Sequence, residues 1–130
     1  MILFDTDTCI EILRGNHKTI KKRTEYPGEI SISFVTVAEL YYGAENSKYP
    51  ADNRAIVDKF LLTIGVIHSD FPILKRFGEI KSGLHKKNLL IPDADIFVAA
   101  AALETSEALV TGNSRHFERI GGLKIENWIR

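Results

Sequence analysis

The sequence predicts an α/β protein in which a central, mainly parallel β-sheet of four to five strands lies between layers of helices. Short strand patterns recur along the whole chain, and longer stretches with helical periodicity separate them. Parallel strands need such helical crossovers to join them. The first strand pattern, residues 2–4, is entirely apolar and has no polar lead-in, which is typical of a strand in the middle of a sheet.

The first part of the chain predicts two strands and three helices. An Asp-Thr-Asp-Thr turn follows the first strand, and apolar residues then repeat at helical spacing up to Gly15. Residues 17–25 are polar and basic, and they predict a short helix that ends before a Tyr-Pro-Gly turn signal. Residues 29–34 alternate polar and apolar side chains, which predicts the second strand. Residues 37–43 predict a helix that ends near a glycine.

The middle of the chain predicts a helix, a strand and a longer helix. Residues 52–62 place Ile, Val, Phe and Leu on one helical face. Residues 65–68 form a short β-branched segment between Gly and Ser-Asp, so we expect the third strand there. Residues 71–85 again repeat apolar side chains at helical spacing.

The last part of the chain predicts a helix, two strands and a turn between them. Residues 92–103 start with Pro-Asp and are rich in alanine, which predicts a helix; residues 107–111 predict the fourth strand. Residues 114–118 are expected to form a short polar turn and residues 120–126 a final edge strand. Pairs of helices separate the second strand from the third and the third from the fourth, so strand and helix do not alternate strictly.

Length and charge limit the classes of protein that are possible. With 130 residues we expect one domain, residues 1–130, with a core that needs no covalent or metal staple. Lys plus Arg and Asp plus Glu both number 17, so the net charge is zero with neutral histidines. Affinity for a nucleic acid would therefore come from local basic clusters and not from overall charge.

The cysteine content and the hydropathy of the chain indicate the cellular compartment of the protein. Cys9 is the only cysteine, so no internal disulfide is possible, and no Cys/His set has zinc spacing. The first residues lack the basic leader and long apolar run of a signal peptide, and no apolar stretch reaches membrane-spanning length. We therefore expect a soluble, cytoplasmic protein.

Acidic side chains, and neutral side chains that contain oxygen, lie near the ends of the predicted strands. Asp5 ends the first strand, Glu39 lies one turn into the helix after the second, and Asp95 starts the helix before the fourth. Thr111 and Asn113 end the fourth strand. Because the carboxyl ends of parallel strands meet at one edge, we expect a common pocket. Clustered carboxylates persist mainly around a hard cation, and oxygen ligands suit Mg²⁺ or Mn²⁺.

Each acidic residue except the first also has a structural alternative. The Thr36-x-x-Glu39 spacing is that of a capping box, so Glu39 could serve the start of a helix instead of a metal. We interpret Asp93, which follows Pro92, as a plain N-cap. Asp95 could serve only the helix dipole, but it lies on the inward face of the same helix, and we prefer it as the ligand.

Asp5 is the hardest of these residues to explain structurally, because it ends a buried strand before any helix begins and so has no capping role. Asp7 has two interpretations, as a cap or as an extra charge at the site. The four histidines have no metal spacing, and only His116 lies near the predicted pocket.

Several segments of the chain, taken in order, are similar to those of a known protein family. They are Met1 to Asp5 followed by Thr6, Val37-Ala-Glu39-Leu40 with Gly43, Asp95-Ile-Phe-Val-Ala-Ala-Ala, Thr111-Gly-Asn113 with Phe117-Glu-Arg119, and Leu123-x-x-Glu126-Asn-Trp128. Together they resemble the PIN-domain ribonucleases, and among these the VapC toxins of bacterial and archaeal VapBC toxin–antitoxin pairs. The likeness covers essentially the whole chain and keeps the order and spacing of the family.

The resemblance implies a three-layer α/β/α fold and a Mg²⁺- or Mn²⁺-dependent endoribonuclease that a small antitoxin protein inhibits. Asp5, Glu39 and Asp95 match the acidic metal ligands of the family, with Glu39 binding directly or through water. A metal-activated water would then attack the phosphodiester bond and leave a 5′-phosphate and a 3′-hydroxyl.

Two positions depart from the family pattern. Asp7 stands where the family often has Asn, and Asn113 stands at the fourth acidic position, at the end of the fourth strand. Three explanations are open: Asn113 contributes its amide oxygen or a bound water, Glu118 takes the role, or one metal ion suffices.

Other residues are expected to assist. Thr6 and Thr111 would orient water or a phosphate oxygen, and Arg14 and Arg115, next to the pocket elements, would contact RNA. The Lys21-Lys22-Arg23 cluster is interpreted as a solvated helix face. Besides RNA, the expected partners are the antitoxin and a second copy of the chain. Three aromatic residues could form an interface for either partner or could equally belong to the core: Tyr41, Tyr42 and Tyr49.

Three other functions are weighed against this one. A haloacid-dehalogenase-like phosphatase would use Asp5 and Asp7 as nucleophile and acid, but it gives Glu39 no role. A receiver-like signalling domain requires strict alternation of strand and helix, which the paired helices break. The third is a non-catalytic RNA-binding module with a decayed site, which Asn113 would explain.

Overall fold

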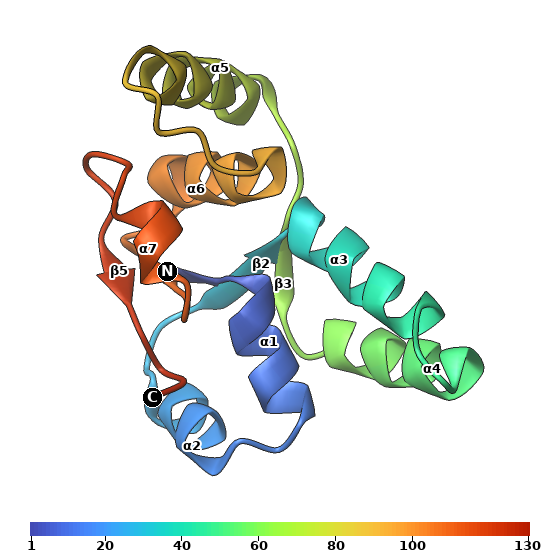
Figure 1. The fold of residues 1–130 in the computed structure, drawn as a ribbon. Coiled ribbons are helices and arrows are strands. Elements are labelled where there is room, and N and C mark those ends of the chain that lie inside the picture. The colour runs from blue at the N-terminus through green and yellow to red at the C-terminus, as the bar shows by residue number, and fades with distance from the viewer.

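The computed structural model describes residues 1–130 and contains one parallel five-stranded sheet with helices on both faces (Figure 1). The strands are β1 (Ile2–Phe4), β2 (Ile30–Ser33), β3 (Gly65–Ile67), β4 (Ala108–Val110) and β5 (Ile125–Glu126). The helices are α1 (Thr6–Leu13), α2 (His17–Glu25), α3 (Phe34–Glu45), α4 (Pro50–Leu61), α5 (Phe71–Lys86), α6 (Asp93–Thr105) and α7 (Ser114–Phe117). The predicted α/β/α class is confirmed.

The first strand lies at the centre of the sheet, as its apolar sequence predicts. The strand order is β3-β2-β1-β4-β5, and every neighbouring pair is parallel. Phe4 of β1 is in register with Ile32 of β2 and with Val110 of β4. The residues that follow these three strands therefore leave the sheet at the same edge.

Alternate residues of β1 separate two hydrophobic cores. Ile2 and Phe4 pack on one face, with residues of α1, α3 and α4 and with Trp128. Leu3 points to the other face, where it joins apolar side chains of α5, α6 and α7. The alanine-rich stretch of α6 is fully buried there, because small side chains let the helix pack closely against both the sheet and α5.

Three element boundaries differ from the prediction. The second strand ends at Ser33, whose hydroxyl caps the next helix by accepting the N–H of Thr36, so α3 begins at once with Phe34. The predicted polar turn at residues 114–118 is the short helix α7. The last strand is only Ile125–Glu126, because a turn with positive φ at Gly122 interrupts the predicted run.

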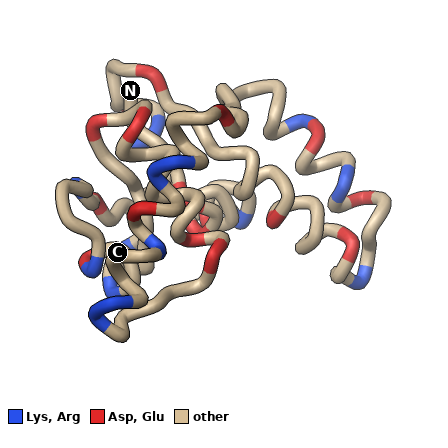
Figure 2. The backbone as a smooth tube through the Cα atoms, turned by 90° about the horizontal axis from the view of Figure 1, so that it is seen from above, with Lys and Arg blue, Asp and Glu red and all other residues tan.

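Charge is distributed without a dominant sign. Acidic and basic residues are interspersed along the backbone tube in Figure 2, in agreement with the zero net charge. None of the helices has both the length and the apolar character that crossing a bilayer requires.

Candidate active site

Asp5 lies at the carboxyl end of β1, in the centre of the sheet edge, and only 6% of its surface is exposed. One carboxylate oxygen accepts the backbone N–H of Thr6 at 2.8 Å, and the other accepts the hydroxyl of Thr111 at 2.8 Å. Asp5 is also the N-cap residue of α1, so the expectation that it has no capping role was wrong. The helix begins directly after the strand, without the predicted turn.

The electrostatic environment of Asp5 disfavours its charge. Burial, the neighbouring carboxylate of Asp7 and, less strongly, that of Asp95 raise the pKa of Asp5 to about 7, although the hydrogen bonds from Thr111 and Thr6 lower it. No Lys, Arg or His forms an ion pair with Asp5. Its negative charge therefore has no cationic partner within the protein.

Asp7 joins α1 to the end of β4. Its Oδ2 accepts the backbone N–H of Gly112 at 2.9 Å, and a Cβ atom at Gly112 would lie 2.9 Å from the same oxygen. Only glycine at this position lets the backbone approach the carboxylate so closely. Burial raises the pKa of Asp7, while the hydrogen bonds that it accepts lower it. Asp7 lies in the first turn of α1 and is not the cap.

Glu39 lies on α3 and is not part of a capping box. The N–H of Thr36 is bound by Ser33 instead, which leaves the Glu39 carboxylate free of that role. Glu39 accepts the hydroxyl of Thr6 at 2.6 Å. Because the N–H of Thr6 also binds Asp5, this threonine connects the two carboxylates, one through its backbone and the other through its side chain.

Asp95 lies in the first turn of α6, and Asp93 points elsewhere. The N-cap position is Pro92, and no side chain caps this helix, so the interpretation of Asp93 as an N-cap was wrong. Asp93 forms an ion pair with Lys81 at 2.9 Å. Asp95 instead contacts His116 of α7, with 2.7 Å between Oδ2 and Nδ1.

Sequence reasoning missed the part that His116 plays in this arrangement. The pattern had only placed it near the pocket, three residues after Asn113, because spacing along the chain cannot reveal a contact with a different helix. The Asn113 side chain lies 3.0 Å from the same ring nitrogen, and its backbone N–H donates to the hydroxyl of Thr111. Glu118 is exposed, and no hydrogen bond or ion pair links its side chain to the carboxylates.

The two candidate RNA contacts are exposed. Arg14 makes only a long ion pair with Glu11, at 3.8 Å, with 72% of the arginine side chain exposed. Arg115 lies on α7, beside His116, and is also exposed. Both guanidinium groups are therefore accessible to a phosphate.

The donor chemistry of this edge fits a hard divalent cation. No three His, Cys, Asp or Glu side chains are close enough in this conformation to hold one ion. Burial and the nearby carboxylates of Asp7 and Asp95 nevertheless raise the pKa of Asp5 to about 7, and no cationic side chain pairs with Asp5. A cation would relieve this repulsion, and carboxylate and hydroxyl oxygens are the ligands that Mg²⁺ and Mn²⁺ prefer.

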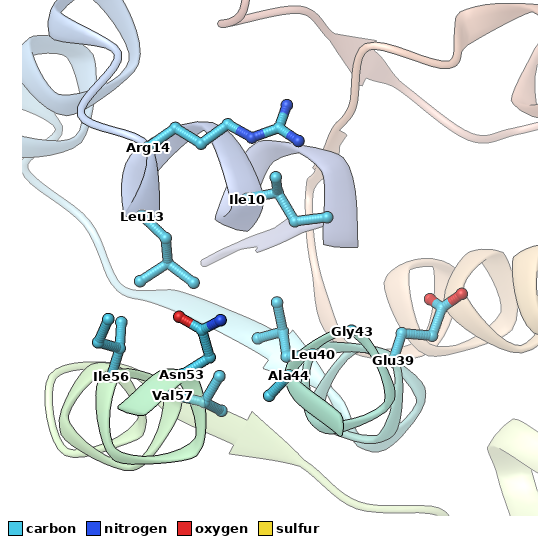
Figure 3. Close-up of a pocket in the computed structure, with 10 residues that line it drawn as sticks. All are labelled: Ile10, Leu13, Arg14, Glu39, Leu40, Gly43, Ala44, Asn53, Ile56 and Val57. Carbon is cyan, nitrogen blue, oxygen red and sulfur yellow. The ribbon is translucent and has the colours of Figure 1, made fainter. Parts of the chain in front are cut away.

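A mainly apolar groove of about 350 Å³ lies between α1, α3 and α4 (Figure 3). Glu39 and Arg14 are its charged residues, and Asn53 is polar. The remaining lining residues are Ile10, Leu13, Leu40, Gly43, Ala44, Ile56 and Val57. Glu39 thus belongs both to the candidate site and to this groove.

Comparison with known proteins gives matches over almost the entire chain. A sequence model of the PIN domain matches residues 2–123. Ribonuclease VapC2 of Haemophilus influenzae is 38% identical over 128 residues, which are 98% of this chain and 97% of that protein. The tRNA(fMet)-specific endonuclease VapC of Shigella flexneri is 33% identical over 127 residues, 97% of this chain and 96% of that protein.

Two solved structures agree with the fold over the same extent. VapBC2 from Rickettsia felis, bound to a DNA fragment from its promoter, has a TM-score of 0.89 and 31% identity, and the match covers 98% of this chain and 99% of that chain. DNA-bound VapBC from Salmonella typhimurium has a TM-score of 0.90 and 34% identity, with 98% and 97% covered.

Proposed function

The chain belongs to the PIN-domain family and within it to the VapC ribonucleases, and from this we propose that it is a metal-dependent endoribonuclease, the toxin of a toxin–antitoxin pair. The observation that carries the assignment of the site is Asp5. It is a buried carboxylate with a pKa raised to about 7, surrounded by further carboxylates and without a cationic side chain. The family match removes the phosphatase and receiver alternatives.

We propose Mg²⁺ or Mn²⁺ as the cofactor, with Asp5 and Asp95 as ligands and Glu39 as a ligand directly or through water. When bound, the ion supplies a water of lowered pKa and neutralises charge on the scissile phosphate. Thr111 holds the Asp5 carboxylate in place, and Thr6 orients Glu39. The exposed Arg14 and Arg115 would bind RNA phosphates.

The test compares two aspartates of the same helix. Purified protein with Mg²⁺ should cleave total RNA and leave 5′-phosphate ends, and EDTA should stop cleavage. Asp95→Asn should reduce the rate by at least about a hundredfold, since even outer partners of metal ligands contribute about 10–100-fold. Asp93→Asn is the matched control and should keep nearly full activity, because Asp93 pairs with Lys81.

Full activity of the Asp95→Asn variant would contradict the assignment of this ligand. If neither the wild type nor the Asp93→Asn control cleaves RNA in the presence of metal, the result would favour a decayed site, which is the remaining alternative for the chain.

We further propose that an apolar segment of the antitoxin binds in the groove between α1, α3 and α4. The similar solved structures include antitoxin, and the groove combines apolar lining with one acidic and one basic residue, Glu39 and Arg14. A segment there would lie beside Glu39 and thereby block the candidate site. Ile56, 48% exposed, is an apolar lining residue that an occupant would cover.

Ile56→Lys should weaken antitoxin binding by at least about tenfold, because burying a charge in an apolar contact without a partner is costly. The control is Leu62→Lys, since Leu62 is 88% exposed and lies outside the groove. Binding is measured by titration calorimetry with the co-purified antitoxin after separation. If the Ile56→Lys and Leu62→Lys variants bind the antitoxin with equal affinity, the antitoxin binds outside this groove.

A further inference from the structure

The contact between His116 and Asp95 joins α7 to α6 through two residues that lie 21 positions apart in the sequence. His116 is the only side chain that hydrogen-bonds Asp95, and no backbone N–H of α6 is capped by this carboxylate. The Asp95 side chain is 19% exposed and that of His116 33%, so the pair is largely shielded from water. The orientation of the Asp95 carboxylate thus depends on one imidazole.

The direction of this hydrogen bond follows from the chemistry of the two groups. An ionised carboxylate can only accept, so the 2.7 Å contact requires the proton on Nδ1 of His116. The amide nitrogen of Asn113 lies farther away, at 3.0 Å from the same Nδ1, and a protonated Nδ1 cannot accept a hydrogen bond from it. The bond to Asp95 therefore fixes the ring with Nδ1 protonated, and it occupies one of the two carboxylate oxygens.

The position of His116 is itself fixed by the core. Its neighbour Phe117 is fully buried among the alanines of α6, and this anchors α7 to the helix that carries Asp95. Glu118, on the other side of Phe117, is exposed and makes no contact with the carboxylates. His116 is the residue of α7 that hydrogen-bonds a proposed ligand.

We propose that His116 is a positioning residue of the proposed nuclease site, which holds the Asp95 carboxylate through Nδ1–H so that its other oxygen can bind the cation. This inference rests on the proposed function, because it assigns Asp95 as a ligand. It also adds His116 to the candidates for a fourth site residue, beside Asn113 and Glu118. Hydrogen-bonded partners of ligating carboxylates commonly contribute about 10–100-fold to metal affinity.

The test measures Mn²⁺ affinity directly, by the electron paramagnetic resonance signal of free Mn²⁺ during titration of the whole protein. His116→Ala should weaken binding at least about tenfold, whereas His116→Asn should restore most of it, because the Asn amide N–H lies where Nδ1–H lay. The control is His85→Ala, at an exposed histidine near the end of α5, and it should bind like the wild type.

Two further measurements separate positioning from folding and from direct ligation. Thermal melting without metal should show all variants folded at the titration temperature, and ¹⁵N spectra of the histidine rings should show His116 protonated on Nδ1. Equal Mn²⁺ affinity of the wild type and a folded His116→Ala variant would overturn the inference alone. Nitrogen couplings to bound Mn²⁺ would overturn it in favour of direct ligation. A wild type that binds no Mn²⁺ would overturn the proposed function as well.

Discussion

Asp5→Asn is expected to remove RNA cleavage and, in the absence of metal, to make the protein more stable. The loss of activity follows because Asp5 is the most buried of the proposed ligands and the strand that carries it is central to the sheet. A neutral amide cannot balance a cation, so the rate should fall by at least about a hundredfold. The gain in stability has a separate physical cause.

The sign of the stability effect follows from the pKa of Asp5. The pKa of Asp5 is about 7 in the folded protein, against an ordinary value of 3.8, so between these pH values the folded state binds more protons than the unfolded state. Stability therefore falls as the pH rises through this window, and the full penalty remains above pH 7. The raised pKa of Asp5 corresponds to a penalty of about 4 kcal/mol for the folded state. Asn carries no charge and removes this penalty, while its weaker hydrogen bonds to Thr6 and Thr111 offset part of the gain.

The measurement is the melting temperature at pH 8 in EDTA, together with the cleavage rate in Mg²⁺. A chain of this size shifts by about 4 °C per kcal/mol, so we expect Asp5→Asn to melt several degrees higher than the wild type. Asp52→Asn, an exposed position on α4, should change neither quantity appreciably. A variant that is both inactive and less stable would contradict the proposed uncompensated charge.

The sheet and its acidic edge could be predicted because their signals are local. The apolar run of residues 2–4 is sufficient to place β1 at the centre, and parallel register then brings the residues after β1 and β4 to one edge. The pairing of Asp5 with Thr111 follows from this register alone. Helix α5 was likewise visible in the helical spacing of its apolar side chains, and α6 in its Pro-Asp start and its alanine content.

Helix starts were less predictable, because several side chains in one segment can cap and the backbone decides among them. At α3 the Thr36-x-x-Glu39 pattern suggested a capping box, but the chain turns helical directly after β2, so Ser33 is the residue in position to cap. At α1 the same direct transition makes Asp5 the cap. In both cases the strand runs into the helix without the loop that the pattern implies.

The contact of His116 could not be predicted, since it depends on how α7 packs against α6. A polar four-residue segment has no periodicity from which a facing side chain can be inferred. Only the burial of Phe117 fixes α7, and that burial is a property of the assembled core. A residue that acts by holding a neighbouring carboxylate can in general be identified only when the positions of the helices and strands are known.

Mg²⁺ is expected to stabilise the protein much more at pH 8 than at pH 6. Proton and cation compete for the Asp5 carboxylate, whose pKa is about 7, so most of it is protonated at pH 6 and ionised at pH 8. At a hundred times its dissociation constant the ion adds about 2.7 kcal/mol, which for this chain is about 10 °C in melting temperature. At pH 6 the same concentration should add clearly less.

Without metal the trend has the opposite sign, because ionisation of Asp5 destabilises the folded state as the pH rises from 6 to 8. The two effects together predict that plots of melting temperature against pH diverge: in EDTA the melting temperature falls from pH 6 to pH 8, and Mg²⁺ removes this decline. Differential scanning calorimetry of the wild type and Asp5→Asn, each with EDTA or Mg²⁺, separates them. In Asp5→Asn both the decline and most of the Mg²⁺ effect should disappear, and a Mg²⁺ shift that is equal in the variant and the wild type would assign the ion to a site without Asp5.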